Sequence, residues 1–357
     1  PRSLWPVSSG VMSIAILIGL HKYSTIPPIM FHPFRQAKIL ITGGLGFIGS
    51  NLAIELVKRR AIITIVDNLT PNQGGNLFNI DPVKKDVAVN YCDIRDVSAM
   101  EQLVKGKDYI FHLARQTDHM LSQKDPFPDI DINVRGTTII LEACKKYNPN
   151  VKFIYTGTRG QYGKAVKLPV SEGAPTNPRG IYEVTNLAAE KIVQIYHDIH
   201  GIRSVMLRLT NIYGPRSQMK HDHFGVVNWF IRLALDQIPI PVFGDGLLTR
   251  DFIYIDDATE AILKTAASDN CYGEVVNIGK EKADTFLHLA KTIVQLSKHA
   301  SYALTPFSKE RAAQEPGHFA SDITKINRLT GWRPTTTLTT GLTKTLNFYK
   351  KYKKHYW

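Results

Sequence analysis

The sequence predicts an α/β protein built on a parallel, doubly wound sheet, with a smaller C-terminal lobe interwoven with it. Over residues 38–214, short apolar runs of strand length alternate with amphipathic stretches of helical length, the pattern of a parallel sheet covered on both faces. After residue 214 this alternation weakens, and neither an internal repeat nor a low-complexity linker separates the two parts. A chain of 357 residues with 43% hydrophobic residues is long enough to bury a large core.

The first predicted strand, residues 39–41, runs directly into a glycine-rich turn and then into an amphipathic helix that includes residues 51–57. Its glycines fit both G-x-G-x-x-G and G-x-x-G-x-x-G, and they are Gly43, Gly44, Gly46 and Gly49. Without a Cβ, these residues let the backbone turn sharply, approach a pyrophosphate and pack a helix against a strand. The turn therefore predicts a Rossmann-type dinucleotide site, with the phosphates at the start of the helix that opens near Phe47.

An acidic residue follows the second predicted strand, residues 61–66. Asp67 stands about where an acid hydrogen-bonds the ribose 2′-OH of an adenosine. Because a carboxylate there repels a 2′-phosphate, the sequence predicts NAD rather than NADP as the cofactor. The alternative is a surface aspartate that caps the following loop.

Polar side chains also follow the later strands of the predicted sheet. These strands are expected at residues 87–91, 109–114, 151–155 and 204–208. The first of them leads to Asp93, which we expect to meet the adenine amino group, to act as the N-cap of helix 97–104, or to do both. The third ends near Thr158. Since ligands bind at the carboxyl ends of strands in such sheets, we expect these residues to share one site.

Helices and further strands complete the predicted elements. The longer helices of the first part span residues 130–146 and 181–200, and Tyr182 and Asn186 lie one turn apart on one face of the second. Beyond residue 214 we expect helices at 224–235 and 286–298 and strands within 250–257 and 275–279. Segments near 250–280 are expected to return to the first domain.

The chain divides into four predicted segments. They are an N-terminal extension (1–36), an NAD-binding Rossmann domain (37–214), a mainly substrate-binding lobe (215–348) and a basic tail (349–357). The extension, expected to be disordered or non-native, holds an apolar run at 11–20 that is too short for a bilayer span of roughly 20 residues. A membrane tether is the alternative. The tail is expected to be a frayed, solvated helix end, with a lipid-binding tail as the alternative.

The net charge and the cysteines limit the class of partner. A formal charge of +13 suits an anionic ligand such as a nucleotide sugar, and equally a loose attraction to nucleic acid or anionic lipid. No nucleic-acid motif supports the second option, and we expect no stable membrane insertion. The cysteines, Cys92, Cys144 and Cys271, show no metal or redox spacing, which predicts no metal site and favours a reducing, cytoplasmic setting.

Longer motifs resemble those of one enzyme family. They are TGGLGFIG, IVDN, HLA at residues 112–114, LRLTNIYGPR and GDGLLTRDFIYIDD. With these motifs, residues 38–346 resemble the extended short-chain dehydrogenase/reductase family, specifically its nucleotide-sugar epimerases and dehydratases. The resemblance implies NAD as cofactor, a nucleotide-diphosphate sugar as substrate and a reaction like that of UDP-glucose 4-epimerase. Relatives commonly pair through the helices that correspond to residues 130–146 and 181–200, which implies a homodimer.

The resemblance also implies roles in the reaction. Tyr182 matches the base that acts on the sugar hydroxyl, and Thr158 matches the hydroxyl group that shares its hydrogen bond. The family's lysine, four residues after the tyrosine, is replaced by Asn186, which can still hydrogen-bond a ribose hydroxyl. A positive charge about 5 Å from a phenolate is worth roughly 3 kcal/mol, or about two pKa units, at an effective dielectric constant near ~20. Arg159 is a candidate for the missing cation, and a solvent-facing or phosphate-facing arginine is the alternative.

The resemblance extends to the residues expected around both ligands. The expected cofactor residues are Gly43, Gly46, Phe47, Ile48, Gly49, Asp67, Asn68, Asp93, Ile94, Leu113, Ala114, Tyr182 and Asn186. The expected substrate residues are Thr158, Arg159, Asn211 and Arg250. For Asn211 the alternative is a turn-forming residue, and for Arg250 it is an ion pair with Asp256 or Asp257.

The sequence leaves three functions open. An NAD-dependent 4-epimerase is the expected one, and a nucleotide-sugar reductase or dehydratase is the first alternative, although the Asp-Glu pair that a 4,6-dehydratase needs is absent after Thr158. The second alternative is a catalytically weak protein that binds NAD or a nucleotide sugar. It is favoured by Asn186 and by Glu315, which stands where the family has a second phosphate-binding arginine. Either Arg311 or His318 is expected to act in place of that arginine, or the substrate is expected to lie differently.

Overall fold

The computed structural model describes residues 33–307 and 315–357. The folded unit begins at Pro33, earlier than the boundary expected at residue 36. The reason is Phe34, which is buried and packs on the rings of Tyr109 and Phe111, with centroids 5.1 and 6.5 Å away. The prediction for the rest of the N-terminal extension, residues 1–32, lies outside the described residues.

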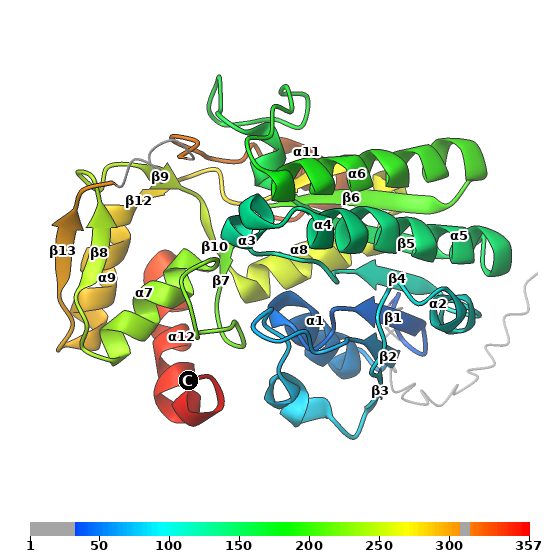
Figure 1. Ribbon diagram of the computed structural model, residues 1–357, viewed down its shortest axis with the longest axis horizontal. Helices are drawn as coiled ribbons and strands as arrows, with labels where there is room; N and C mark the ends of the chain where they lie inside the picture. The colour runs from blue at the N-terminus through cyan, green and yellow to red at the C-terminus, as the bar shows by residue number, and fades with distance from the viewer. Residues whose placement is uncertain (1–32, 308–314) are drawn as a thin grey trace, which may run out of the picture. The chain divides into compact units, whose positions relative to one another are not determined.

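Seven parallel strands form the central sheet in the order β11-β6-β5-β4-β1-β2-β3 (Figure 1). Their bounds are β1 Lys38–Thr42, β2 Ile62–Val66, β3 Val87–Asn90, β4 Tyr109–His112, β5 Lys152–Thr158, β6 Arg203–Leu209 and β11 Val275–Ile278. The strand order reverses between β1 and β4, which confirms the predicted doubly wound sheet and places a crevice at the carboxyl ends of these strands. The position of β11 confirms that the chain returns to this sheet after leaving it.

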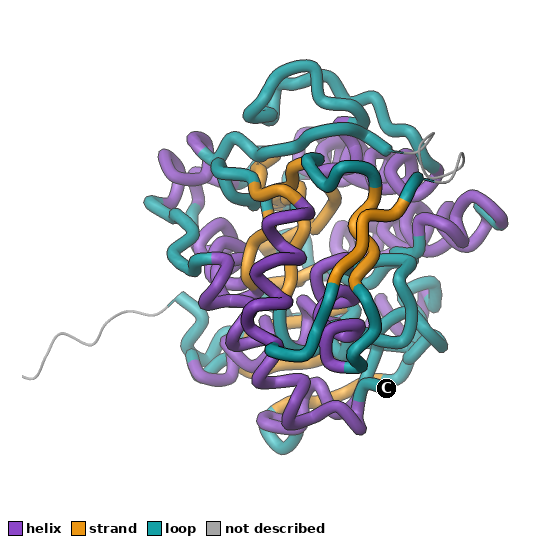
Figure 2. The backbone as a smooth tube through the Cα atoms, turned by 90° about the vertical axis from the view of Figure 1, so that its left-hand side faces the viewer, coloured by secondary structure: helices purple, strands orange, loops and turns teal. Residues whose placement is uncertain are grey.

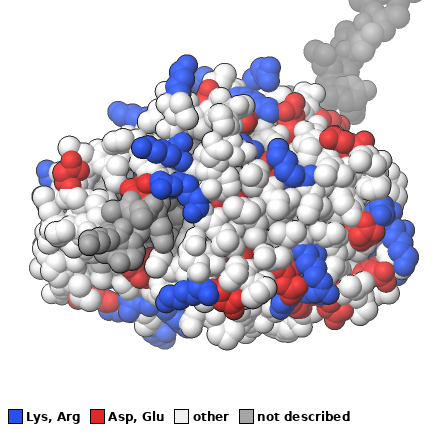
Figure 3. Space-filling view, turned by 45° about the horizontal axis from the view of Figure 1, so that its top comes forward, with Lys and Arg blue, Asp and Glu red and all other residues white. Residues whose placement is uncertain are grey.

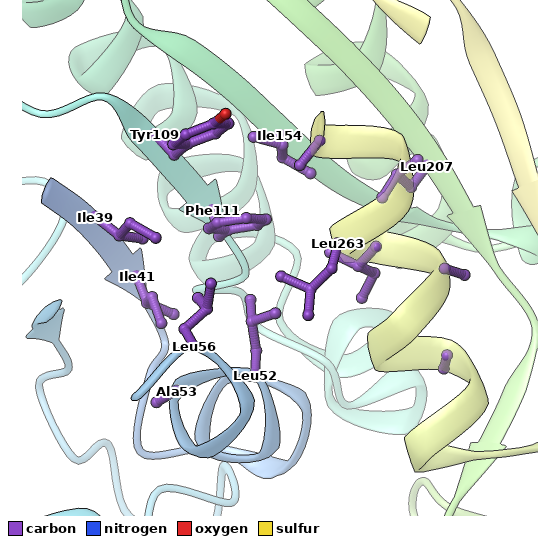
Figure 4. Close-up of a cluster of buried hydrophobic side chains, with 14 of the residues drawn as sticks. Ile39, Ile41, Leu52, Ala53, Leu56, Tyr109, Phe111, Ile154, Leu207 and Leu263 are labelled. Atoms are coloured by element: carbon purple, nitrogen blue, oxygen red, sulfur yellow. The ribbon is translucent and has the colours of Figure 1, made fainter. Parts of the chain in front are cut away.

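Helices cover both faces of the sheet (Figure 1). One face carries α1 (Phe47–Lys58), α8 (Ile255–Ala267) and α11 (Thr324–Thr330), and the other carries α2 (Val97–Leu103), α5 (Thr137–Tyr147) and α6 (Ile181–His200). Because side chains alternate along a strand, Ile39 and Ile41 of β1 enter the first core and Leu40 enters the second. Figure 4 shows part of the first core, with Leu52 and Leu56 of α1 facing the strands.

The helix predicted over residues 130–146 is continuous, but its first part is π-helical rather than α-helical. A π-helical turn, η2 (Ile130–Gly136), precedes α5 and follows two short helices, α3 (His119–Lys124) and α4 (Phe127–Asp129). Short 3-10 turns complete the connections, and they are η1 (Leu77–Val83), η3 (Arg159–Tyr162), η4 (Asp269–Cys271) and η5 (Lys353–His355). These short elements bring α3 and α4 against the first half of α6.

The second lobe has its own hydrophobic core. It contains α7 (Val226–Leu235), α9 (Phe286–Ser297), α12 (Leu338–Tyr352) and the parallel strands β8 (Ile240–Phe243) and β13 (Tyr302–Thr305). Figure 2, which faces this lobe, shows the strand pair alongside a helix. Two further pairs are β7 (Asn211–Tyr213) with β10 (Phe252–Tyr254) and β9 (Thr249–Arg250) with β12 (Asp284–Thr285). Since β7 begins two residues after β6 ends, the lobe is joined directly to the carboxyl edge of the central sheet.

The C-terminal residues are folded rather than solvated. Tyr349 and Tyr356 are buried, and the Tyr356 hydroxyl donates a hydrogen bond to Asn79 Oδ1 at 2.7 Å. The lysines of this segment are exposed. The prediction of a frayed helix end for residues 349–357 is therefore wrong, because the aromatic side chains pack into the core of the second lobe while the basic ones face the solvent.

Charged side chains of both signs are interspersed on the face shown in Figure 3. Within the part of the chain that the structure describes, no helix is long and apolar enough to cross a membrane, and no group of three or more His, Cys, Asp or Glu is placed to hold a metal ion. The three cysteines are free thiols, of which Cys144 and Cys271 are buried.

Candidate functional site

A cavity of about 710 Å³ lies at the carboxyl ends of β1, β4 and β5 and extends toward the second lobe. This volume falls within the usual range of small-molecule sites. The predicted site residues in its wall are Gly43, Gly46, Phe47, Ile48, Gly49, Asp67, Asn68, Asp93, Ile94, Leu113, Ala114, Thr158, Arg159, Tyr182 and Asn211. Two predicted residues, Asn186 and Arg250, are not in the wall. The structure thus brings the expected cofactor and substrate residues to one cavity, with two exceptions.

The glycine turn between β1 and α1 forms one side of the cavity. At Gly43, φ is +69° and an added Cβ would lie 2.8 Å from the backbone nitrogen of Ala114. At Gly49, an added Cβ would lie 2.7 Å from the Cα of Gly44, so glycine lets α1 start close to the turn. No side chain caps the first turn of α1 and no acidic residue occupies it. Its backbone N–H groups are therefore open to an anion, as a dinucleotide pyrophosphate requires.

Asp67 lies in the cavity wall directly after β2. Its carboxylate accepts hydrogen bonds from the backbone N–H of Leu45 at 3.0 Å and of Leu69 at 2.9 Å. Burial raises the pKa of Asp67, and these two hydrogen bonds act in the opposite direction. The aspartate does cap the following loop, as the alternative expects, but it does so from inside the cavity, where a ribose hydroxyl can also reach it.

Asp93 carries a firmly ionised carboxylate in the wall of the cavity. It forms an ion pair with Arg95 at 2.8 Å and accepts a hydrogen bond from Asn68 Nδ2 at 2.8 Å. The hydrogen bond from Arg95 lowers the pKa of Asp93 to about 2. The expected N-cap role of Asp93 is wrong, because Asp96 caps α2 by accepting a hydrogen bond from the backbone N–H of Ala99.

Tyr182 and Thr158 reach the cavity from two adjacent elements. Tyr182 is the second residue of α6, and Thr158 is the last residue of β5. Both side chains line the cavity, and the Thr158 hydroxyl acts on the Tyr182 phenol, whose pKa it lowers. Burial raises the pKa of Tyr182 to about 12, while the positive charge of Arg115 acts in the opposite direction. A phenol and a hydroxyl arranged in this way can exchange a proton with the hydroxyl group of a bound ligand.

Asn186 is turned toward its own helix. Its Nδ2 donates a hydrogen bond to the backbone oxygen of Tyr182 at 2.7 Å, whereas its Oδ1 is buried without a hydrogen-bond partner. The side chain is fully buried. Asn186 does not line the cavity, because an asparagine is short enough to satisfy the helix backbone and does not extend into the cavity as a lysine would.

Arg159 is the first residue of η3, directly after β5, and lines the cavity. Its Nε donates a hydrogen bond to Asn211 Oδ1 at 3.2 Å, and its guanidinium lies 4.8 Å from the centre of the Phe319 ring. Burial, followed by the charge of Arg250, lowers the pKa of Arg159 to about 10. The solvent-facing alternative is wrong, since Arg159 and Asn211 together present polar groups to the part of the cavity next to the second lobe.

Arg250 is buried and held by the segment that follows residue 314. It forms an ion pair with Glu315 and donates a hydrogen bond to the backbone oxygen of Gly317 at 2.5 Å. The expected alternative partners, Asp256 and Asp257, are wrong, because β9 and the 315–318 segment bring Glu315 to Arg250 instead. His318 contacts the Thr249 hydroxyl at 3.1 Å, and Arg311 lies outside the described residues.

Three further residues in the wall carry chemistry that sequence reasoning does not identify: Arg115, His119 and Glu183. His119 Nδ1 lies 2.8 Å from Glu183 Oε1, and the His119 ring lies 4.4 Å from that of Tyr182. Glu183 could be found as the neighbour of Tyr182 in the sequence. Arg115 and His119 carry no such local signal, because their partners come from other elements.

Asp129 of α4 lies behind this group. It is fully buried, its Oδ1 accepts a hydrogen bond from Asn133 at 3.3 Å, and its Oδ2 has no hydrogen-bond partner. Burial raises its pKa to about 7, and the negative charge of Glu183 acts in the same direction. Asp129 is thus a buried acid that holds its proton to near neutral pH.

Known proteins resemble the chain across both of its parts. The model of the NAD dependent epimerase/dehydratase family matches residues 39–279. A Methanocaldococcus jannaschii protein with the provisional name UDP-glucose 4-epimerase is 36% identical over 315 residues, which are 87% of this chain and 98% of that protein. The UDP-N-acetyl-alpha-D-glucosaminuronate decarboxylase of Bacillus cytotoxicus is 33% identical over 325 residues, 88% of this chain and 98% of that protein. The crystal structure of Thermotoga maritima UDP-glucose 4-epimerase with UDP-glucose superposes with a TM-score of 0.80 at 30% identity, covering 88% of this chain and 99% of that one.

Proposed function

Because this chain belongs to the NAD-dependent epimerase/dehydratase family, we propose that it inverts carbon 4 of a nucleotide-diphosphate sugar. The observation that carries this proposal is that Tyr182 and Thr158 line the same cavity as the glycine turn. The base for a sugar hydroxyl and the binding site for a dinucleotide therefore open into one cavity, where both can reach the same substrate.

NAD is the cofactor of this family, and the residues present fit it. Gly43 and Gly49 leave room for the pyrophosphate at the open start of α1, and Asp67 offers a carboxylate to the adenosine ribose. Asp93 and Ile94 are proposed to contact the adenine, and Leu113 and Ala114 to line the central part of the dinucleotide site. Held by these residues, NAD would supply a reversible hydride acceptor for the sugar carbon.

The protein's own residues handle the proton and the orientation of the sugar. Tyr182, as phenolate, takes the proton of the sugar hydroxyl when the carbon is oxidised and gives it back when the carbon is reduced. Thr158 holds the phenol and the hydroxyl in line. Inversion would require the oxidised sugar to turn over in the cavity before Tyr182 gives the proton back, so that the carbon is reduced on its other face.

The substrate diphosphate is proposed to lie near Arg159 and Asn211. The guanidinium of Arg159 and the amide of Asn211 both line the cavity and can donate hydrogen bonds to phosphate oxygens. Arg250, expected as a second contact, is ion-paired with Glu315, so we propose that it supports the 315–318 segment beside the cavity. Pro316 of that segment lines the cavity.

We also propose a homodimer that forms through α6 and the segment before α5. Five large apolar side chains of this region are exposed, namely Phe127, Ile130, Val184, Ile195 and Ile199. A patch of this kind on a folded chain is typical of a protein interface. The free cysteines fit the reducing cytoplasm, which we propose as the compartment of this dimer.

One experiment tests the proposed reaction. The purified protein is offered UDP-, GDP-, CDP- and dTDP-sugars, the products are separated by chromatography, and the bound cofactor is identified after denaturation. We expect bound NAD and formation of an epimer from one nucleotide class. Bound cofactor without any product would contradict the epimerase and favour a binding role.

A second candidate function is elimination of water from the sugar, and the pair of His119 and Glu183 favours it. An imidazole and a carboxylate beside Tyr182 are an acid and a base of the kind that elimination needs, although they come from α3 and α6 rather than from the end of β5. The same panel separates the two reactions, because elimination lowers the product mass by one water and epimerisation leaves it unchanged.

A further inference from the structure

The position on α6 where a lysine is expected holds an uncharged residue, yet a guanidinium lies next to it. Arg115 follows β4, and its guanidinium lies 4.2 Å from the centre of the Tyr155 ring. Its Nη1 donates a hydrogen bond to the Tyr155 hydroxyl at 3.1 Å, and that hydroxyl donates one to the backbone oxygen of Asn186 at 2.7 Å. Tyr155 thus fixes Arg115 against the first turns of α6, close to Tyr182.

The charge of Arg115 is not cancelled by a neighbouring carboxylate. Among residues 33–307 and 315–357, no ion pair involves Arg115, and its Nε and Nη2 are buried without hydrogen-bond partners. Arg115 also lines the cavity that contains Tyr182. A buried guanidinium with two unused donors is costly to leave without a partner, so this arrangement is more readily explained by a role toward a ligand or a neighbouring anion.

We propose that Arg115 supplies the positive charge that stabilises the phenolate of Tyr182, in place of a lysine at position 186. This inference rests on the proposed function, in which Tyr182 is the base. Arg115 acts through Tyr182 and is a positioning residue for the reaction, held by Tyr155 on β5 rather than by α6 itself.

The groups that face Tyr182 from the surrounding elements support this choice. Glu183 of α6 and Asp129 of α4 are acidic and oppose the phenolate, whereas Thr158 at the end of β5 donates to it. The ring of His119 on α3 lies tilted against the ring of Tyr182, but His119 is paired with Glu183. After burial, Arg115 has the largest influence on the pKa of Tyr182, and it lowers it. Arg159, the candidate suggested by sequence, is bound to Asn211 on the substrate side.

The test removes or relocates the positive charge of Arg115 and measures the pKa of the phenol at position 182 directly. A 3,5-difluorotyrosine is incorporated at position 182, because its lower intrinsic pKa brings the titration into a range where the protein stays folded, and its pKa is followed by 19F NMR in cofactor-free protein. We expect Arg115→Met to raise this pKa by about one to two units. Arg115→Lys should stay close to the parent protein, and the double variant R115M/N186K should recover most of the shift because the charge returns from α6.

Controls make the result specific to Arg115. Arg159→Met removes another arginine of the same cavity and should move the pKa much less than Arg115→Met does. Arg115→Gln replaces Arg115→Met if the methionine variant does not fold, which circular dichroism checks. The proposal would be overturned if the pKa at position 182 were unchanged in Arg115→Met or Arg115→Gln. It would also be overturned if Arg159→Met shifted this pKa as much as Arg115→Met does.

The outcome is separable from the proposed reaction. The titration uses neither substrate nor cofactor, so absence of epimerase activity would leave the role of Arg115 toward Tyr182 intact. If both proposals hold, the pH dependence of kcat in Arg115→Met shifts upward by the same amount as the NMR titration. Epimerase activity combined with an unmoved pKa would overturn the inference on Arg115 alone.

Discussion

The buried phenol of Tyr182 sets the chemical limit of this site. With a pKa of about 12 in the cofactor-free protein, roughly one molecule in 10⁵ carries the phenolate at pH 7. Every positive group near the phenol therefore increases the active fraction, which includes Arg115 and the nicotinamide of bound NAD. The turnover of the proposed reaction should accordingly rise with pH through the neutral range.

Removal of the Tyr182 hydroxyl tests its role as base. We expect Tyr182→Phe to lower kcat by about 10² to 10⁴, the usual contribution of a general base, while NAD remains bound because the glycine turn and Asp67 are untouched. Steady-state kinetics and the NAD content of the purified variant are the measurements. The matched control is Tyr302→Phe on β13, which is exposed and does not line the cavity. Retention of more than half of the activity in Tyr182→Phe would contradict the assignment.

Asp129 predicts an unusual dependence of stability on pH. The folded protein holds the Asp129 proton up to a pH of about 7, whereas an unfolded aspartate releases it near 3.8. Between these values the folded state binds more protons, so stability falls as pH rises, by at most ~1.4 kcal/mol per pH unit. Asp129→Asn cannot ionise and removes this slope. We subtract the free energy of unfolding of the wild type from that of Asp129→Asn at each pH. This difference should increase by about 1 to 3 kcal/mol between about pH 4.5 and about pH 7.

Urea denaturation at several pH values measures this difference. The exposed Asp86→Asn is the control, because an aspartate in solvent has nearly the same surroundings in the folded and unfolded chains. A difference between Asp129→Asn and wild type that stays constant with pH would contradict the prediction.

At the scale of elements, the glycine turn is where sequence and structure agree most closely. Strand β1, the turn and α1 are encoded within one continuous stretch, residues 38–58, so periodicity and the missing Cβ atoms are sufficient to predict them. The change from π-helix in η2 to α-helix in α5 within the predicted helix 130–146 is not encoded in this way. At Gly136, an added Cβ would lie 2.6 Å from the side chain of Ile94, a contact with the segment after β3 that no local pattern reveals.

Gly49→Ala tests the packing of α1 on the turn. Because an added Cβ would lie 2.7 Å from the Cα of Gly44, α1 must shift away from the turn, and the pyrophosphate site opens with it. We expect the variant to lose at least about tenfold in NAD affinity and about 1 to 3 kcal/mol in stability. Calorimetric titration with NAD and urea denaturation measure the two effects.

The control for this change is Gly173→Ala. Nothing lies within 4 Å of a Cβ added at Gly173, and its backbone is not in the left-handed region, so both quantities should stay close to wild type. If Gly49→Ala bound NAD as tightly as Gly173→Ala, the glycine turn would not be the dinucleotide site.

At the scale of the whole molecule, predictions fail where they depend on contacts between distant parts of the chain. The fold class and most of the cavity wall follow from strand ends, which the topology of a parallel sheet gathers at one edge. The packing of Tyr356 against Asn79 joins residues 277 apart, and the contact of Arg115 with Tyr155 depends on the order of β4 and β5. Neither contact is visible in a local pattern. The packing of residues 349–357 and the position of Arg115 were therefore not predictable from the sequence.

The proposed dimer makes a prediction about the surface of α6. Val184, Ile195 and Ile199 are exposed and lie on one face of the helix, since their spacings of eleven and four residues are close to whole turns. Burying an isoleucine stabilises an interface by about 1.5 to 3 kcal/mol, and a glutamate there would leave a charge without solvent. We expect the wild-type protein to have twice the mass of one chain in light scattering, and Ile199→Glu to shift it toward the monomer. Leu304→Glu, an exposed apolar residue on β13, should leave the dimer intact. A monomeric wild type, or a dimer that persists in Ile199→Glu at micromolar concentration, would show that this face of α6 does not form the interface.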